Sequence, residues 1–200
     1  MKNYTFKKVD EKPTLDSPVW NDVEKATLDN DNFCGENAEK ITVTAQGVCT
    51  KYGITVKFES DEKNPVTKYS HANQPAWTDS CVEFFLAPYP DEQGNYLNFE
   101  QSLGGALLLQ KGPNAADRTY IPHSDEFFET EKHIDENGWK IKFFIPFSFI
   151  DKHFATMNKK FRGNFQFCCE DKNVYLTWNR IENPFPAFHK PEYFGEMTLD

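Results

Sequence analysis

The sequence has no long apolar run. It contains no stretch of 18 apolar residues, and its first residues, MKNYTFKKVDEKPTLDSP, include basic side chains without the apolar core of an export signal. We therefore expect no membrane-spanning helix, and we expect the chain to be either cytoplasmic or a domain cut from a secreted protein. Ala and Leu at helical spacing are also sparse, which argues against a helical fold.

Positive charge and paired cysteine motifs are scarce as well. The formal net charge of -9 opposes long-range attraction to nucleic acid and anionic lipid, so neutral ligands are the more compatible partners. The five cysteines form an odd set without a CxxC motif, which argues against a zinc knuckle and supplies no disulfide framework. Reduced, mostly buried thiols are expected at these positions, which are Cys34, Cys49, Cys81, Cys168 and Cys169.

Aromatic residues, in contrast, are abundant. The chain contains 19 Phe, 8 Tyr and 4 Trp, and flat side chains of this kind favour the pleated face of a sheet. Apolar and polar residues alternate over residues 52–60, and Asn137-Gly138 marks a hairpin turn. We expect one all-β domain over residues 1–200, a β-sandwich of two mostly antiparallel sheets with one or two short helical turns, one of them within residues 146–157.

Trp77 stands out among the aromatic residues. It lies in PAWTDSCVEFF (residues 75–85), at an expected junction between loop and strand where an indole stays partly exposed, and Trp178 lies near the end of the strand segment VYLTWNRI. Two facing indoles cover the apolar C–H faces of a pyranose ring at a small cost in rotamer freedom. Tyr175 or Trp20 remains an alternative to Trp178 as the partner of Trp77.

Polar side chains gather on the two strands that follow Trp77. Alternation places Glu83 on one face of its strand, and Asn98 and Glu100 share one face of the next. A short turn containing Gly94 makes these strands hairpin neighbours, so the three side chains are expected to converge and bind the hydroxyl rim of a sugar. Two alternatives stay open: ordinary exposed carboxylates, or Glu83 and Glu100 as the acid–base pair of a glycoside hydrolase or another carbohydrate-processing enzyme.

A calcium site and a haem site are the other candidates. The loop PDEQGNY offers oxygen ligands from Asp91, Glu92 and Asn95, which suits a structural calcium ion, although the full EF-hand pattern is missing and a solvated turn is the alternative. A haem-binding redox-partner sandwich is a second alternative function, with Met157 or Met197 as axial ligand.

Two long segments resemble a known family. PAWTDSCVEFFLAPYPDEQGNYLNFEQSLGGALL and TWNRIENPFPAFHKPEYFGEMTL, together with residues 16–20, resemble the carbohydrate-binding module family 9-like proteins. The shared features are a Trp-x-Asp-Ser-x-Val-Glu stretch, an Asn-Phe-Glu strand and a terminal Phe-His-x-Pro-Glu-x-Phe-Gly, which together span most of the chain. The resemblance implies a β-sandwich that binds the reducing end of a glycan between two Trp rings and holds structural calcium ions.

Family roles fall on matching positions of this sequence. The resemblance implies Trp77 as one aromatic wall, Glu83 as a hydroxyl acceptor and Trp178 as the second wall, with Asn98 and Glu100 in the matching strand. We therefore expect a non-catalytic, monomeric module that binds a mono- or oligosaccharide and neither nucleic acid nor membranes. The family's xylanase-attached modules act beside a glycoside hydrolase, whereas this sequence shows neither a catalytic domain nor an export signal.

Overall fold

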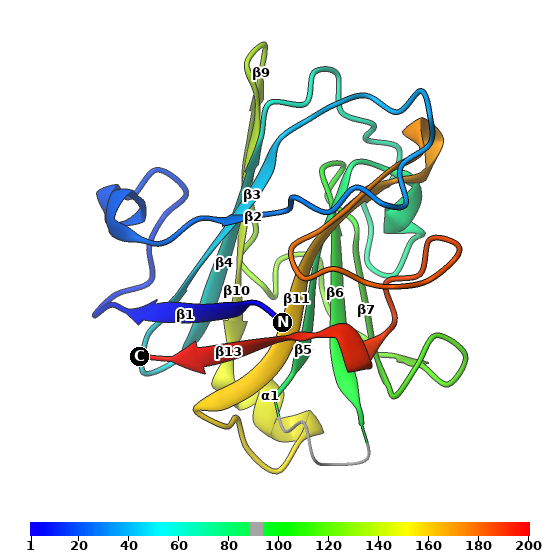
Figure 1. Cartoon of the computed structure of the whole chain (residues 1–200). Coiled ribbons are helices and arrows are strands. Elements are labelled where there is room, and N and C mark those ends of the chain that lie inside the picture. Colours follow the sequence, from blue (N-terminus) through cyan, green and yellow to red (C-terminus); the bar gives the residue numbers. More distant parts are fainter. Residues whose placement is uncertain (89–93) are drawn as a thin grey trace.

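Two β-sheets pack face to face as a sandwich in the computed structural model, which describes residues 1–88 and 94–200 (Figure 1). The first sheet contains, in spatial order, β8 (Thr119–Tyr120), β7 (Leu107–Gly112), β6 (Tyr96–Ser102), β5 (Cys81–Ala87), β11 (Lys160–Cys169), β13 (Gly195–Leu199) and β1 (Asn3–Lys8), with β12 (Val174–Thr177) also paired to β11. The second contains β1, β3 (Val43–Cys49), β4 (Gly53–Ser60), β10 (Gly138–Pro146) and β9 (Glu131–Asp135), with β2 (Ala26–Thr27) paired to β3.

Strand β1 belongs to both sheets. Its residues from Asn3 to Phe6 pair in parallel with β13, and Lys7 and Lys8 pair in parallel with β3. All other strand pairings recorded in the described part of the chain are antiparallel. The expected fold class, a mostly antiparallel all-β sandwich, is therefore confirmed, and the first and last strands lie side by side across the front of the molecule in Figure 1.

Short helical turns connect the strands. They are α1 (Phe147–His153) and the single-turn 3-10 helices η1 (Pro18–Asp22), η2 (Ala76–Thr78), η3 (Glu170–Lys172) and η4 (Pro191–Tyr193). The helix expected within residues 146–157 is present in a shorter form, as α1. The described residues contain more short helical turns than the one or two expected. Within the described residues, none of these helices has the length and apolarity that crossing a bilayer requires.

Aromatic rings fill the space between the sheets. The Phe165 ring of β11 lies 5.3 Å from the Tyr4 ring, 5.9 Å from the Phe58 ring and 5.2 Å from the Phe84 ring, measured between centroids. These neighbours come from strands of both sheets, so Phe165 links the two layers. The alternation over residues 52–60 points Ile54, Val56 and Phe58 into this core, as expected.

A buried carboxylate fixes the loop that leads into β5. Glu62 accepts hydrogen bonds from Ser80 Oγ, Trp139 Nε1 and Lys172 Nζ, each at 2.7 Å. Because all of its partners donate, the Glu62 charge is compensated inside the protein. This network anchors Ser80, the residue just before β5, and so fixes where that strand begins.

We predict that Phe165→Ala lowers the free energy of unfolding by about 3–5 kcal/mol, because it removes a ring from the centre of the core and leaves a cavity. Chemical denaturation measures the change. Phe185→Ala is the matched control, since the Phe185 ring is exposed, and it should change stability by less than about 1 kcal/mol. Similar losses in both variants would contradict the central position of Phe165.

Candidate functional site

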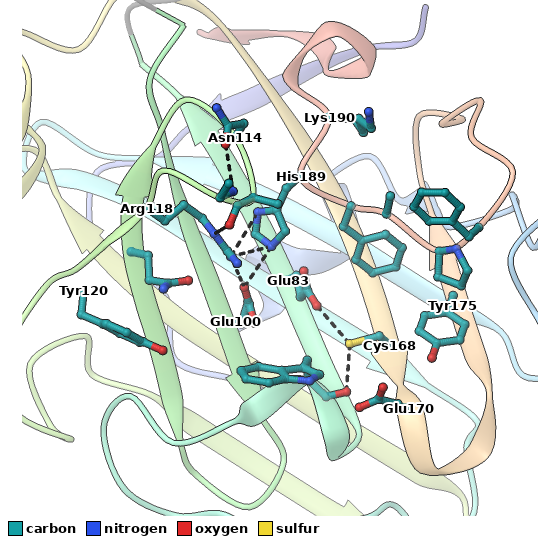
Figure 2. A pocket seen from close by; sticks show the side chains of 18 residues that line it. Glu83, Glu100, Asn114, Arg118, Tyr120, Cys168, Glu170, Tyr175, His189 and Lys190 are labelled. Carbon is teal, nitrogen blue, oxygen red and sulfur yellow. Dashed lines mark hydrogen bonds and ion pairs between the residues drawn. The ribbon is translucent and has the colours of Figure 1, made fainter.

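A pocket of about 660 Å³ lies on the face of the first sheet that points away from the second. Six neighbouring strands each contribute one side chain to its floor. The strand register places each of these residues directly opposite the next one, or two residues away from that position. From β8 to β12 they are Tyr120, Gln110, Glu100, Glu83, Cys168 and Tyr175. The walls are formed by residues 114–116, Arg118, residues 185–190 and Trp77. Figure 2 shows Asn114, Arg118, His189 and Lys190 among them.

Trp77 sits on η2, directly before β5. The turn is held because the Asp79 N–H donates to Ala76 O at 3.0 Å and Asp79 Oδ2 accepts from the Tyr69 N–H at 2.9 Å. The Trp77 side chain stays 39% exposed and lines the pocket. The expected position, a partly exposed indole between loop and strand, is therefore confirmed, while its part in binding stays a prediction.

Glu83 and Glu100 lie directly opposite each other on β5 and β6. Both are 3% exposed, and both line the pocket. Burial, followed by the neighbouring Glu100 charge, raises the pKa of Glu83 well above its ordinary range. Burial also raises the pKa of Glu100 to about 7, although Arg118 and the Asn98 amide oppose the shift. The pair therefore holds protons at pH values where an exposed carboxyl has lost them.

Arg118 and His189 complete the polar part of the pocket. Arg118 Nη1 donates to His189 Nε2 at 2.6 Å and lies 3.7 Å from Glu100 Oε1. A guanidinium only donates, so Nε2 must accept and Nδ1 must carry the imidazole proton, which it donates to Tyr96 Oη at 2.9 Å. Burial and the Arg118 charge lower the pKa of His189 to about 3, so this imidazole is neutral at neutral pH.

Arg118 and His189 line the pocket although the sequence did not predict them as site residues. Figure 2 shows them turned toward Glu83 and Glu100, between Tyr120 on one side and Tyr175 on the other. Both come from irregular segments, where no periodic pattern shows which way a side chain points.

Asn98 does not line the pocket, so the structure does not bring it together with Glu83 and Glu100 at the pocket surface. It is fully buried, and its Nδ2 donates to Glu100 Oε1 at 2.9 Å. Asn98 does share one face of β6 with Glu100, as predicted, but of these two residues only Glu100 lines the pocket. Asn98 therefore orients the Glu100 carboxyl from the side.

Trp178 is not a pocket wall, so the expected pair of facing indoles is wrong. The Trp178 indole is 4% exposed and packs in the core, 6.2 Å from the Tyr4 ring and 5.7 Å from the Phe165 ring. Tyr175 lies three residues earlier, and this odd spacing turns its ring to the opposite side, into the pocket. The alternative partner Tyr175 is therefore the aromatic residue in place, whereas Trp20 is buried elsewhere.

The other candidates of the sequence analysis lie elsewhere. Asp91 and Glu92 fall outside the described residues, and Asn95 is half-buried in the turn before β6, so the calcium site stays a prediction. Met197 is buried between the sheets and Met157 packs against the same core, so neither lines the pocket and the haem alternative gains no support.

The chain is similar to known proteins over nearly its whole length. Residues 15–199 match the family model of carbohydrate-binding family 9. No curated protein matches the chain. A Bacteroides uniformis protein, named as a candidate carbohydrate-binding protein, has a similar crystal structure with a TM-score of 0.85 and 24% identity, and the alignment covers 100% of this chain and 99% of that one.

Two further solved structures share the fold. A family 9 carbohydrate-binding module from Caldicellulosiruptor kristjanssonii in complex with glucose has a TM-score of 0.66 and 14% identity, covering 100% of this chain and 96% of that one. A family 9 module from the same organism in complex with cellotriose has a TM-score of 0.64 and 15% identity, covering 99% and 93%.

We predict that Glu100→Gln raises the melting temperature at pH 8 by a few degrees. The folded-state pKa of Glu100, about 7, exceeds its ordinary value of 4.5, so folding binds protons in this range and the stability of the unsubstituted protein falls as the pH rises from 5 to 8. Glutamine carries no charge, so the advantage of the variant should grow over the same range. Thermal unfolding in buffer without metal ions measures it.

Glu59→Gln is the control with the opposite sign. Glu59 pairs with Lys57 at 2.7 Å and Lys25 at 3.1 Å, and although burial opposes it, these lysines hold the pKa of Glu59 below its ordinary value. This variant should be less stable than the unsubstituted protein at pH 8. A Glu100→Gln variant that melts below the unsubstituted protein at pH 8 would contradict the claim that ionisation of the buried Glu83 and Glu100 carboxyls destabilises the folded protein.

Proposed function

Because this chain belongs to carbohydrate-binding family 9, a family of non-catalytic carbohydrate-binding modules, we propose that the pocket on the first sheet is its sugar site. In this proposal a pyranose ring stacks on Trp77, and Glu83 and Glu100 bind its hydroxyl groups. The observation that carries the proposal is the placement of a partly exposed indole beside two buried carboxyls in one pocket.

Aromatic side chains supply the apolar contacts. A pyranose ring has C–H groups on both faces, and an indole offers a large flat surface with only two side-chain torsions to order. Trp77 takes one face, and we assign the other to Tyr175, whose half-buried ring lines the same pocket from β12. A tyrosine in this role is smaller than an indole, so it covers less of the ring.

Polar side chains supply the hydroxyl contacts. Each sugar hydroxyl both donates and accepts, and the pocket offers both kinds of partner. An ionised carboxylate accepts, a protonated carboxyl donates, and the Arg118 guanidinium donates. The raised pKa values of Glu83 and Glu100 allow the pair to hold one proton and so present both forms at neutral pH. A shielded hydrogen bond to a charged group contributes about 1.5–3 kcal/mol.

Charge and volume restrict the ligand class. The formal net charge of -9 and the acid pair favour a neutral sugar over a phosphorylated or acidic one, and they disfavour nucleic acid and anionic membranes as partners. A volume of about 660 Å³ lies in the range of small-molecule sites and exceeds the needs of one hexose. The proposed ligand is therefore a mono- or short oligosaccharide, bound by a monomer.

Glucose and cellotriose, the ligands in the two Caldicellulosiruptor kristjanssonii structures, are the first ligands to test. Xylose oligomers belong in the same panel, because a role beside a xylan-degrading hydrolase is the setting proposed from the family resemblance. Reducing-end binding is tested by comparing each sugar with its reduced alditol, and structural calcium by repeating the titrations with a chelator.

We predict that Trp77→Ala weakens binding of the preferred sugar at least tenfold, equivalent to about 1.4 kcal/mol, because it removes the flat surface under the ring. Isothermal titration calorimetry measures the affinity, which should lie between micromolar and millimolar. Tyr52→Ala is the matched control, since Tyr52 is also an exposed aromatic residue but lines no part of this pocket. Equal affinities for Trp77→Ala and the unsubstituted protein would remove Trp77 from the site.

A second prediction separates Tyr175 from Trp178. Tyr175→Ala should weaken sugar binding several-fold, because a pocket wall is lost, with little change in melting temperature. Trp178→Phe should lower the melting temperature and leave affinity unchanged, because the Trp178 indole lies in the core. Calorimetry and thermal unfolding on both variants give the comparison, and the reverse result would assign the second wall to Trp178.

A further inference from the structure

Three side chains with metal-binding groups meet under Trp77. Cys81 and Cys168 are direct partners across β5 and β11, and Glu83 lies two residues beyond Cys81 on the same face of β5. The two sulfur atoms and a Glu83 carboxylate oxygen all lie within 4.8 Å of one another. All three side chains are buried, and Glu83 and Cys168 border the pocket.

The hydrogen bonds of this cluster leave its donor groups poorly matched. Cys168 Sγ has one proton and two acceptors within reach, Glu83 Oε1 at 3.0 Å and Trp77 O at 3.3 Å (Figure 2). Cys81 Sγ has a distant backbone acceptor, Val82 O, at 3.7 Å. Sulfur and carboxylate groups arranged in this way form weak hydrogen bonds, but they are strong ligands once deprotonated.

An orphaned amide next to the cluster is an independent observation. Gln166 lies opposite Glu83 on β11 and shares a strand face with Cys168. Gln166 is fully buried, and neither its Nε2 nor its Oε1 finds a hydrogen-bond partner among the described residues. Side chains beside a metal site commonly bind the ligands or the coordinated water, so an ion bound at this cluster would offer the amide a partner.

We propose that Cys81, Glu83 and Cys168 bind one zinc ion at the floor of the pocket. Two sulfurs and one carboxylate oxygen form a donor set suited to zinc. Ligand bonds of about 2.0–2.3 Å place tetrahedral ligands about 3.3–3.8 Å apart, and the three donor atoms here all lie within 4.8 Å of one another. The ion displaces one proton from each thiol and the proton that burial retains on the Glu83 carboxyl, and these protons leave to solvent.

The fourth zinc position faces the pocket, since Glu83 and Cys168 line it. Water or a sugar hydroxyl fills this position. The complex of one zinc ion, two thiolates and one carboxylate has a single negative charge, and Arg118, which already acts on Glu83, lies on the same side of the sheet. The zinc site needs no sugar, so its test is independent of the proposed function.

Cobalt is the probe, because thiolate coordination to cobalt gives a charge-transfer absorption band that zinc or calcium does not produce. The full chain, with all five cysteines reduced, is titrated with Co²⁺, and then with Zn²⁺ as competitor. We expect the band to saturate at one Co²⁺ per chain and to disappear with one equivalent of Zn²⁺, and native mass spectrometry to show one bound zinc. A protein without the band, or with a band that does not saturate, would overturn the proposal.

Variants locate the site. Cys168→Ser and Cys81→Ser should each weaken cobalt binding at least tenfold, and Glu83→Gln should also weaken it while both thiols remain. Cys34→Ser is the matched control, because Cys34 is a half-buried free cysteine that bonds to Tyr175 O and is not one of the three clustered ligands, and it should keep full binding. Loss of the band in Cys34→Ser would show that cobalt binds to other thiols. The same conclusion would follow if the band were unchanged in Glu83→Gln and in a folded variant of Cys81 or Cys168.

Discussion

The register between β5 and its two neighbours is the constraint on which the pocket depends. It places Glu83 opposite Glu100 on one side and opposite Gln166 on the other. The apolar residues that alternate with Glu83, Val82 and Phe84, are fully buried between the sheets. A slip by one residue would exchange the two faces, so the packing of the core also fixes the positions of the pocket side chains.

This arrangement costs the folded protein stability. Two carboxyls face each other in a buried site, and their raised pKa values show that the folded protein disfavours their ionised forms. Arg118 offsets part of this cost, and the neutral His189 holds Arg118 in place without adding a second positive charge. Binding sites commonly keep such strained groups, because a ligand that satisfies them gains affinity from the same interactions that destabilise the free protein.

Much of the fold follows from local sequence patterns. The alternation over residues 52–60 and the turn at Asn137-Gly138 predict strands and hairpins that the structure contains, because half-buried strands need a period of two. The partly exposed position of Trp77 could be predicted from the flanking Pro75 and Asp79. The pairing of Glu83 with Glu100 could be predicted from strand alternation and a short turn. The 3-10 turns escape notice because one turn is too short to show a period.

The remaining site residues depend on non-local pairing. Cys81 meets Cys168 only because β5 lies beside β11, and no local motif marks that neighbourhood. Arg118 and His189 come from the irregular segments that form the walls of the pocket, and no periodic pattern in the sequence predicts the path of these segments. Trp178 misleads because a strand end with polar neighbours looks exposed, whereas Gly195, lying against the indole, leaves room for it in the core: a Cβ there would be 2.3 Å from Trp178 Cζ3.

The parallel pairing of β1 with β13 determines how the molecule responds to mechanical tension. The register runs from Asn3 opposite Glu196 to Phe6 opposite Leu199, so the chain ends emerge at opposite ends of this strand pair. A force that pulls the ends apart slides the two strands past each other and loads their hydrogen bonds together, instead of peeling them off one at a time. The fold should therefore resist tension applied at its two termini through the shear geometry of these two strands.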